Sequence, residues 1–330
     1  MTSSRPLVTL ITPFHNGAEL LGPAIESALA QTYDRWEYVL VDNQSTDGAG
    51  AVAERYAQRD PRIRLVRTDT LLPQDLNYSE ALRRASPESV YCKFVQADDL
   101  LFPRCVEEMV ALAEAHPRVG IVGAYYVEGP RVSGGGVPYP TTVLPGRDAC
   151  RLQLQHGHFL FGSPTTVLLR TAMVRETTPY YDPNVFHSDT EACYRDLERW
   201  DFGFVHQVLS LMRIDNPGRM TRVRTYYPYA LDKFIVVTKY GRKYLSPAEF
   251  AQVDAFSRSG YFRLLGQAYF TRRNPDFWRY HREGLATIGY QLRWYRLWRY
   301  LALALVDLIG NPKMTLGRMV RALRGQVPDR

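Results

Sequence analysis

The first 125 residues alternate between short apolar runs rich in β-branched residues and stretches with helical periodicity. The runs begin about 25 to 30 residues apart, which is the spacing of a strand–helix–strand unit. Repeated crossovers of this kind predict an α/β fold with a mostly parallel sheet, flanked by helices on both faces. The expected strands are Leu7–Thr12, Tyr38–Val41, Ile63–Arg67, Val90–Val95 and Val119–Ala124.

Four helices are expected between these strands. Apolar residues recur at helical spacing from Leu20 to Leu29, and Thr46-Asp47-Gly48 opens a second helix. Asn77–Ala85 and Pro103–His116 are the other two, with Pro103 in the first turn, where a missing N–H costs nothing. Ligands of such sheets bind beyond the carboxyl ends of the strands. Binding and catalytic residues are therefore expected directly after the strands.

Charge and composition exclude several classes of protein. Residues 279–330 hold ten basic and three acidic residues, so they account for the whole net charge of +7. The rest of the chain is balanced, which argues against a nucleic-acid groove. The 4 cysteines form no CxxC pair, which disfavours a disulfide scaffold or zinc ribbon and suits a reducing cytoplasm. The sequence shows neither a signal peptide nor an apolar run of about 18 residues.

The first two expected strands end in polar residues. The first continues as Thr12-Pro13-Phe14-His15-Asn16-Gly17, whose single glycine disfavours a dinucleotide-binding turn. The second ends at Asp42, placed to accept hydrogen bonds from a nucleobase or a ribose hydroxyl. For the residues that follow we favour helix capping, with Ser45 or Thr46 as the cap and Asp47 facing the helix dipole.

The fourth strand is followed by two adjacent acids, Asp98 and Asp99, in the run KFVQADDLLFP. Two neighbouring carboxylates repel each other unless a cation lies beside them. Oxygen ligands of this kind suit Mg²⁺ or Mn²⁺. A cap for the helix that begins near Pro103 is the alternative role.

Taken in order, these motifs resemble the opening of family 2 glycosyltransferases. That family has a strand ending P-x-Y/F-N, a helix ending S-x-x-x-Q-T/S-Y/F, and then E-x-x-x-V-D-D-G-S-T-D. The corresponding residues here are Pro13, Phe14 and Asn16, then Ser27, Gln31, Thr32 and Tyr33, then Glu37, Val41, Asp42, Ser45, Thr46 and Asp47. The resemblance covers about 125 residues in the right order and spacing.

The resemblance implies a GT-A fold and an inverting transferase with a nucleotide-diphospho-sugar donor. Asp42 would contact the base, and Asp98 and Asp99 would bind a divalent cation, Mn²⁺ or Mg²⁺. The family's metal motif is commonly D-x-D-D, and Gln96 stands here in place of the first acid. The donor-nucleotide residues that it implies are Pro13, Phe14, Asn16, Asp42, Gln96 and Ala97.

An inverting transferase needs a general base beside the acceptor hydroxyl. The run Ser188-Asp189-Thr190-Glu191 resembles the family's E-D-x-D/E-L-x-x-R segment, which makes Asp189 the expected base and leaves Ser188 as a departure. Asp189 also opens a helix, so capping is its alternative role. Glu191 is a candidate on the acceptor side, although it could instead form a surface pair with Arg195 four residues later.

Four further residues are assigned to the acceptor or diphosphate side. Gly162 and Ser163 match an acceptor-side segment, where a glycine would let the backbone approach a sugar; an ordinary turn is the alternative. Arg219 and Arg222 are candidates to neutralise the diphosphate, and surface charge is the alternative.

The chain is expected to have three parts: residues 1–128 for the nucleotide sugar, 129–225 for the acceptor, and a mainly helical, basic extension, 226–330. A glycine- and proline-rich loop over Gly129–Gly146 separates the first two. In the extension, residues 294–309 mix aromatic, basic and apolar side chains. We interpret 290–325 as a segment that lies on a membrane surface, with a helix docked on the core as the alternative.

The sequence therefore predicts a cytoplasmic enzyme, peripheral at the inner face of the membrane. It would move a sugar to a glycan or lipid-linked glycan acceptor in cell-surface polysaccharide synthesis. One rival is a sugar nucleotidyltransferase, which would want a basic, glycine-rich loop after the first strand. The other is a catalytically silent binding or scaffold protein, a reading that the departures at Gln96 and Ser188 keep open.

Overall fold

The computed structural model describes residues 5–157, 160–185, 187–213, 223, 225–271, 274–293 and 297–310. The chain forms two compact units. The first contains residues 1–183 and 187–214, and the second contains 184–186 and 215–330. The expected boundaries at 128 and 225 stay predictions, and each unit is described by itself.

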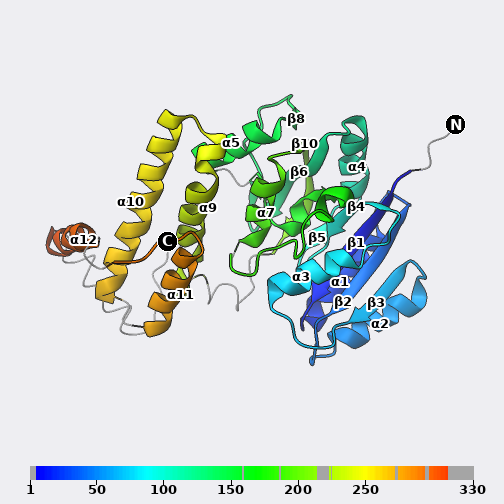
Figure 1. Ribbon diagram of the computed structural model, residues 1–330. Coiled ribbons are helices and arrows are strands. Elements are labelled where there is room, and N and C mark those ends of the chain that lie inside the picture. Colours follow the sequence, from blue (N-terminus) through cyan, green and yellow to red (C-terminus); the bar gives the residue numbers. More distant parts are fainter. Residues whose placement is uncertain are drawn as a thin grey trace. The chain divides into compact units, whose positions relative to one another are not determined.

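The first unit is built on one sheet flanked by helices (Figure 1). Its main path runs in the order β3-β2-β1-β4-β9-β6-β10-β5, with β7 beside β6 and β8 beside β10. The strands are β1 (Leu7–Phe14), β2 (Trp36–Asp42), β3 (Ile63–Arg67), β4 (Ser89–Phe94), β5 (Leu100–Leu101), β6 (Val119–Glu128), β7 (Arg131–Ser133), β8 (Val143–Leu144), β9 (Leu168–Arg170) and β10 (Asp201–Met212).

The long strand pairings of this sheet are parallel. Strands β3, β2, β1 and β4 are parallel neighbours, and β6 is parallel to β10. The antiparallel pairings extend over only two or three residue pairs each. Because β9 is antiparallel to both β4 and β6, the carboxyl ends of β1, β2, β4 and β6 lie at one edge of the sheet. This confirms the expected α/β fold.

Helices cover both faces of the sheet, as the alternation along β1 requires. Val8 and Leu10 belong to a core shared with three helices, whereas Thr9 and Ile11 are buried on the opposite face. The helices of this unit are α1 (Ala18–Leu29), α2 (Ala49–Arg59), α3 (Gln74–Arg83), α4 (Cys105–Ala115), α5 (Gly146–His156), α6 (Thr171–Val174) and α7 (Ser188–Asp196), with the 3-10 turn η1 (Pro164–Thr166). Of these, α1, α2 and α4 share the core with Val8 and Leu10.

The five expected strands and four expected helices are present, with three local corrections. Helix α4 begins at Cys105, so Pro103 precedes the first turn instead of forming part of it. The segment 129–146 is not loop throughout, because it contributes β7 and β8. The cap position of α2 is Gly48, not Ser45 or Thr46.

The second unit is helical in its described residues, as expected. Its helices are α9 (Pro228–Tyr244), α10 (Pro247–Thr271), α11 (Pro275–Ala286) and α12 (Trp298–Gly310). Aromatic rings dominate its core: Phe234 stacks on Tyr261 with ring centroids 5.2 Å apart, and the Tyr261 hydroxyl lies 3.0 Å from Nδ1 of the buried His281. In the part of the chain that is described, no helix has the length and hydropathy to cross a membrane.

Candidate active site

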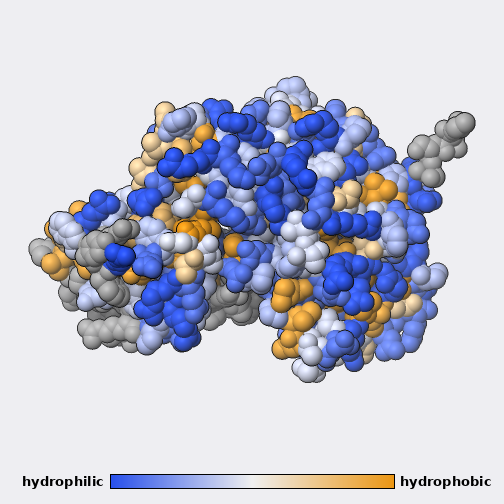
Figure 2. Space-filling view, in the orientation of Figure 1, coloured by the Kyte–Doolittle hydropathy of each residue, from blue (hydrophilic) through white to orange (hydrophobic). Residues whose placement is uncertain are grey.

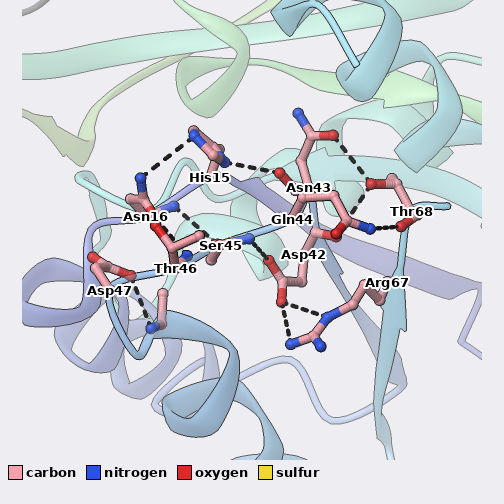
Figure 3. Close-up of polar contacts among 11 residues, drawn as sticks. His15, Asn16, Asp42, Asn43, Gln44, Ser45, Thr46, Asp47, Arg67 and Thr68 are labelled. Atoms are coloured by element: carbon pink, nitrogen blue, oxygen red, sulfur yellow. Dashed lines mark hydrogen bonds and ion pairs between the residues drawn. The ribbon is translucent and has the colours of Figure 1, made fainter. Parts of the chain in front are cut away.

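The loops after β1 and β2 are joined by side chains of the first and third sequence motifs (Figure 3). The Asn16 Oδ1 atom accepts a hydrogen bond from Thr46 N at 2.8 Å, and Asn16 N donates to Ser45 Oγ at 2.9 Å. Asn16 has a positive φ of 64°, which asparagine tolerates better than most residues. Asn16 therefore fixes the shape of the edge where a nucleotide is expected.

Asp42 ends β2 and pairs with an arginine that sequence reasoning missed. Its Oδ2 atom accepts from Arg67 Nε at 3.0 Å and Nη2 at 2.9 Å, and its Oδ1 accepts from Ser45 N at 2.8 Å. The Asp42 side chain is fully buried, whereas that of Arg67 is 61% exposed. Strand register places the two residues opposite each other, since β3 ends where β2 ends. The exposed guanidinium is thus a rigidly held donor at the sheet edge.

Gly50, in the first turn of α2, makes room for this pair. A Cβ atom at position 50 would lie 2.7 Å from both Asp42 Oδ2 and Arg67 Nη2. The pair packs against the helix N-terminus, where backbone N–H groups favour negative charge.

Asp47 joins the beginnings of two helices, which confirms a capping role for it. Its Oδ2 accepts from Gly17 N at 2.6 Å and Ala18 N at 2.9 Å, at the start of α1. Its Oδ1 accepts from Ala49 N at 3.0 Å, at the start of α2. These backbone bonds, that of Ala18 first, lower the pKa of Asp47.

The second motif, which spans the end of α1 and the residues after it, holds the segment that follows Asp98 and Asp99. Gln31 donates to Phe102 O at 3.0 Å and accepts from Val106 N at 3.0 Å. Ser27 Oγ accepts from Leu101 N at 3.1 Å. Ser27 and Gln31 therefore hold in place the loop that contains Asp98 and Asp99. They do not themselves lie at the end of a strand.

Replacing Gln31 by alanine should destabilise the protein by about 2 to 4 kcal/mol, because the Phe102 carbonyl and the buried Val106 N–H lose their partner. Urea denaturation measures the change. Gln58→Ala, at an exposed position of α2, is the matched control and should stay within about 0.5 kcal/mol of the parent. Equal effects of the two substitutions would contradict this role of Gln31.

Gln96, the departure from the acidic motif, uses both ends of its amide. Its Nε2 donates to Tyr78 Oη at 3.0 Å, and its Oε1 accepts from Thr165 Oγ1 at 3.2 Å. Its backbone N also donates to Thr165 Oγ1, at 3.1 Å. The Gln96 amide thus joins Tyr78 of α3 to Thr165 of η1.

The charges of Asp98, Asp99 and Asp189 all act on the buried phenol of Tyr78. Burial is the main cause that raises the pKa of the Tyr78 phenol, and the negative charges of these three carboxylates raise it further. Asp98 is half-buried, whereas Asp99 is buried and its Oδ1 accepts from Arg213 N at 3.1 Å. The expected metal ligands and the expected base thus lie within electrostatic range of the same side chain.

Asp189 lies in the first turn of α7, behind the cap position at His187. It is half-buried, and its Oδ1 accepts from Thr190 N at 2.8 Å. The neighbouring Ser188 donates to Asp75 Oδ1 at 2.6 Å, which joins α7 to α3. An acid at position 188 would face the Asp75 carboxylate, so the serine accounts for this departure from the family pattern.

The surface ion pair considered for Glu191 and Arg195 is wrong. Glu191 is only 2% exposed. Arg195 instead makes a forked contact with Asp196, from Nε to Oδ1 at 2.9 Å and from Nη2 to Oδ2 at 3.2 Å, and donates to Tyr180 O at 2.8 Å. Helix α7 is therefore clamped by Arg195 to the segment that precedes it.

A tight turn over 162–166 lies beside Gln96. Gly162 has φ 54°, and a Cβ there would lie 2.0 Å from Thr166 Oγ1, so the turn itself requires glycine. Ser163 N donates to the same Oγ1 at 3.0 Å. The buried Lys93 donates to the carbonyls of Thr165 and Val167, and burial lowers its pKa. Contact of this turn with a sugar stays a prediction.

The remaining candidates have mixed positions. Pro13 pairs with Val41 in the sheet, and Phe14 belongs to the core. Ala97 is partly buried at the edge of that core. Arg219 and Arg222 lie outside the described residues. The nucleotide contacts assigned to Pro13, Phe14 and Ala97 stay predictions.

The donor set at Asp98 and Asp99 fits a hard divalent cation. Within the described residues, no group of three or more His, Cys, Asp or Glu side chains could hold a metal ion by itself. Mg²⁺ is usually held by one or two carboxylates together with substrate phosphates, and two neighbouring carboxylates meet that need. The residues present therefore suit an ion that binds together with a phosphorylated substrate.

The chain belongs to glycosyl transferase family 2, which it matches over residues 9–177, about half of its length. It is 31% identical to EpsE of Bacillus subtilis (strain 168), named as a glycosyltransferase, over 54% of this chain and 61% of that one. It is 33% identical to TuaG of the same organism, named for teichuronic acid biosynthesis, over 30% and 38% of the two chains. The matches thus span less than two thirds of these relatives.

Solved structures share the fold over nearly the whole chain. TarS 1-349 of S. aureus, in complex with UDP-GlcNAc, has a TM-score of 0.61 at 15% identity, and covers 97% of this chain and 92% of that one. The mannosyltransferase PcManGT of Pyrobaculum calidifontis, in complex with GDP-Man and Mn²⁺, has a TM-score of 0.55 at 19% identity, with 98% and 86% covered. At these identities the similarity establishes the GT-A fold alone.

Proposed function

We propose that this protein is an inverting glycosyltransferase that moves a sugar from a nucleotide-diphospho-sugar to a glycan or lipid-linked glycan in cell-surface polysaccharide synthesis. The observation that carries the proposal is the position of the Asp98–Asp99 pair directly after β4, at the strand-end edge of a family 2 fold, with Asp189 in electrostatic range of the same Tyr78 side chain. TuaG, named for teichuronic acid biosynthesis, supports the acceptor class.

The donor nucleotide binds at the ends of β1, β2 and β3 in this proposal. The Asp42–Arg67 pair offers an exposed guanidinium held in place by a fully buried carboxylate. Such a rigid fork can donate to the carbonyl oxygens of a base, and holding it in advance reduces the entropy lost on binding. The TarS and PcManGT structures contain UDP-GlcNAc and GDP-Man, which supports a nucleotide-sugar donor.

A divalent cation, Mn²⁺ or Mg²⁺, would be held by Asp98 and Asp99, and the Mn²⁺ in PcManGT supports this. When bound, such an ion supplies charge stabilisation for a diphosphate leaving group. Asp99 is tied to Arg213 N, so the buried acid anchors the loop while the half-buried Asp98 faces the ligand.

Asp189 is the general base in this proposal. Its carboxylate takes the proton from the acceptor hydroxyl as the oxygen attacks the anomeric carbon opposite the diphosphate, which inverts the configuration. The bond from Thr190 N to Oδ1 holds the Asp189 carboxylate in the first turn of α7, where it acts as the proton acceptor. Arg195 and Ser188 position the helix that carries the base.

Two alternatives are less well supported. Family membership favours a glycosyltransferase over a sugar nucleotidyltransferase. A catalytically silent protein was suggested by Gln96 and Ser188, but both side chains have defined partners, and neither departure removes Asp98 or Asp189.

Calorimetry with UDP and GDP tests the donor site. Arg67→Ala should weaken binding of the preferred nucleotide about tenfold or more, because a charged hydrogen-bond donor is lost. Arg64→Ala is the matched control, since Arg64 lies on the same strand with a side chain 49% exposed, and it should bind as the parent does. Equal weakening by both substitutions, or binding of neither nucleotide by the parent, would contradict the proposal.

A further inference from the structure

The solvent-facing side of α12 is mostly apolar, with the exposed Arg299 among its apolar side chains. Trp298, Leu305 and Val306 are 68%, 44% and 64% exposed, and Leu303 beside them is 47% exposed. Trp298 and Leu305 are seven positions apart and Val306 is eight from Trp298, so these three share one face of the helix. Figure 2 shows hydrophobic residues interspersed with hydrophilic ones at the position that α12 occupies in Figure 1. We call Trp298, Leu303, Leu305 and Val306 the outer face of α12.

The opposite side of α12 is already covered within its own unit. Leu297 and Tyr300 are buried in the aromatic core, and Tyr300 stacks on Phe262 of α10 with ring centroids 5.7 Å apart. Gly266 of α10 permits this close approach, because a Cβ there would lie 2.9 Å from Tyr300 O. The helix is therefore fixed by its inner face, so its apolar outer face is not part of the core.

Basic residues accompany the outer face. Arg293 and Arg299 are exposed, and residues 279–330 hold ten basic and three acidic residues against an otherwise balanced chain. Lys313, Arg318, Arg321 and Arg324 follow α12 in the sequence, outside the described residues. An apolar helix face flanked by excess positive charge matches the chemistry of an anionic lipid surface, with acyl chains below and phosphates above.

We propose that α12 docks on the surface of an anionic bilayer, with its outer face among the acyl chains and the neighbouring arginines at the lipid phosphates. A second copy of this chain fits less well. Four partly exposed side chains offer less area than the roughly 800 Å² that each partner gives to a standard interface. Two copies would also bring the same positive charges together. The proposal does not depend on the nucleotide chemistry of the first unit.

Burial of the apolar face and attraction of the arginines to anionic lipid act together at such a surface, because either alone gives weak, reversible binding. We expect α12 to need both. Partition onto vesicles should therefore require anionic lipid and should fall as salt screens the arginines.

Sedimentation with vesicles tests the proposal on the full-length protein. The parent should partition onto phosphatidylcholine vesicles that contain phosphatidylglycerol and much less onto phosphatidylcholine alone. Val306→Asp should lower partition onto the anionic vesicles about tenfold or more, since a charge enters the acyl region. Val132→Asp is the matched control: Val132 of β7 is 62% exposed, close to the 64% of Val306, and this variant should partition as the parent does.

Three results would overturn the proposal: no partition of the parent onto anionic vesicles, equal losses in the two valine variants, or a dimer in solution that Val306→Asp dissociates. The last result would assign the outer face of α12 to a second copy. Nucleotide binding measured on the same samples keeps the two proposals apart. Lipid partition without nucleotide binding would refute the proposed function alone, and the converse would refute membrane docking alone.

Discussion

An Asp189→Asn enzyme should bind its nucleotide-sugar donor as the parent does and transfer the sugar about 10²- to 10⁴-fold more slowly. The amide is nearly isosteric with the carboxylate and can still accept from Thr190 N, so the first turn of α7 keeps its bond. What it cannot do is take the proton from the acceptor hydroxyl. The donor contacts come from other elements, so donor binding should not change.

Transfer to the acceptor, and donor binding by calorimetry, measure the two effects separately. Asp148→Asn is the matched control, because Asp148 is an exposed acid in the first turn of α5, and it should transfer at the parent's rate. Full transfer activity in Asp189→Asn would reduce Asp189 to a helix-terminal role. The base would then be sought at Glu191, the other acid in the first turn of α7.

The site residues at strand ends were the ones that the sequence predicted best. Parallel strands end at one edge, so Asp42 and the Asp98–Asp99 pair could be assigned to the same edge from hydrophobic patterning alone. Arg67 was accessible by the same logic, because it is the last residue of the expected third strand and lies opposite Asp42. It was missed because a lone arginine at a strand end carries no motif.

Contacts between distant segments could not be read from the sequence. Ser188 and Gln96 look like losses in a linear motif, yet each suits a partner far away in the chain. Ser188 meets Asp75 and Gln96 meets Tyr78, neither of which is marked by local pattern. Glu191 and Arg195 illustrate the opposite case. Their spacing favours a pair, but burial of α7 places Asp196 and Tyr180 O at the arginine instead.

The match to the family motif also gives no sign of a strained backbone at Gln44. Gln44 stands where the family pattern V-D-D-G-S has glycine, and it keeps the left-handed conformation with φ 62°. A left-handed backbone costs a non-glycine residue roughly 1 kcal/mol. The Gln44 amide donates to Thr68 O, which offsets part of that cost and ties the turn to the residue after β3.

Replacing Asp98 by asparagine should remove the effect of the cation. In the parent, Mn²⁺ should tighten binding of a nucleoside diphosphate, since the ion is shared between protein carboxylates and phosphate oxygens. In Asp98→Asn, the affinity should be the same with and without Mn²⁺. Transfer should fall about 10²-fold or more, because charge stabilisation of the leaving diphosphate is lost.

Asp98 is the better position for this test than Asp99. Asp99 is buried and holds Arg213 N, so its replacement would disturb the end of β10 as well as any ion. Asp98 is half-buried, and an amide of the same shape fits there without a cavity. Thermal unfolding in the presence of UDP, with and without Mn²⁺, is the measurement, and Asp69→Asn, an exposed acid after β3, is the control. If Asp98→Asn kept the parent's Mn²⁺-dependent stabilisation by UDP, the cation would not be bound by Asp98. The alternative role as a cap of α4 would not apply either, because the cap position of α4 is Arg104, and the acidic pair would keep only the structural contact from Asp99 to Arg213 N.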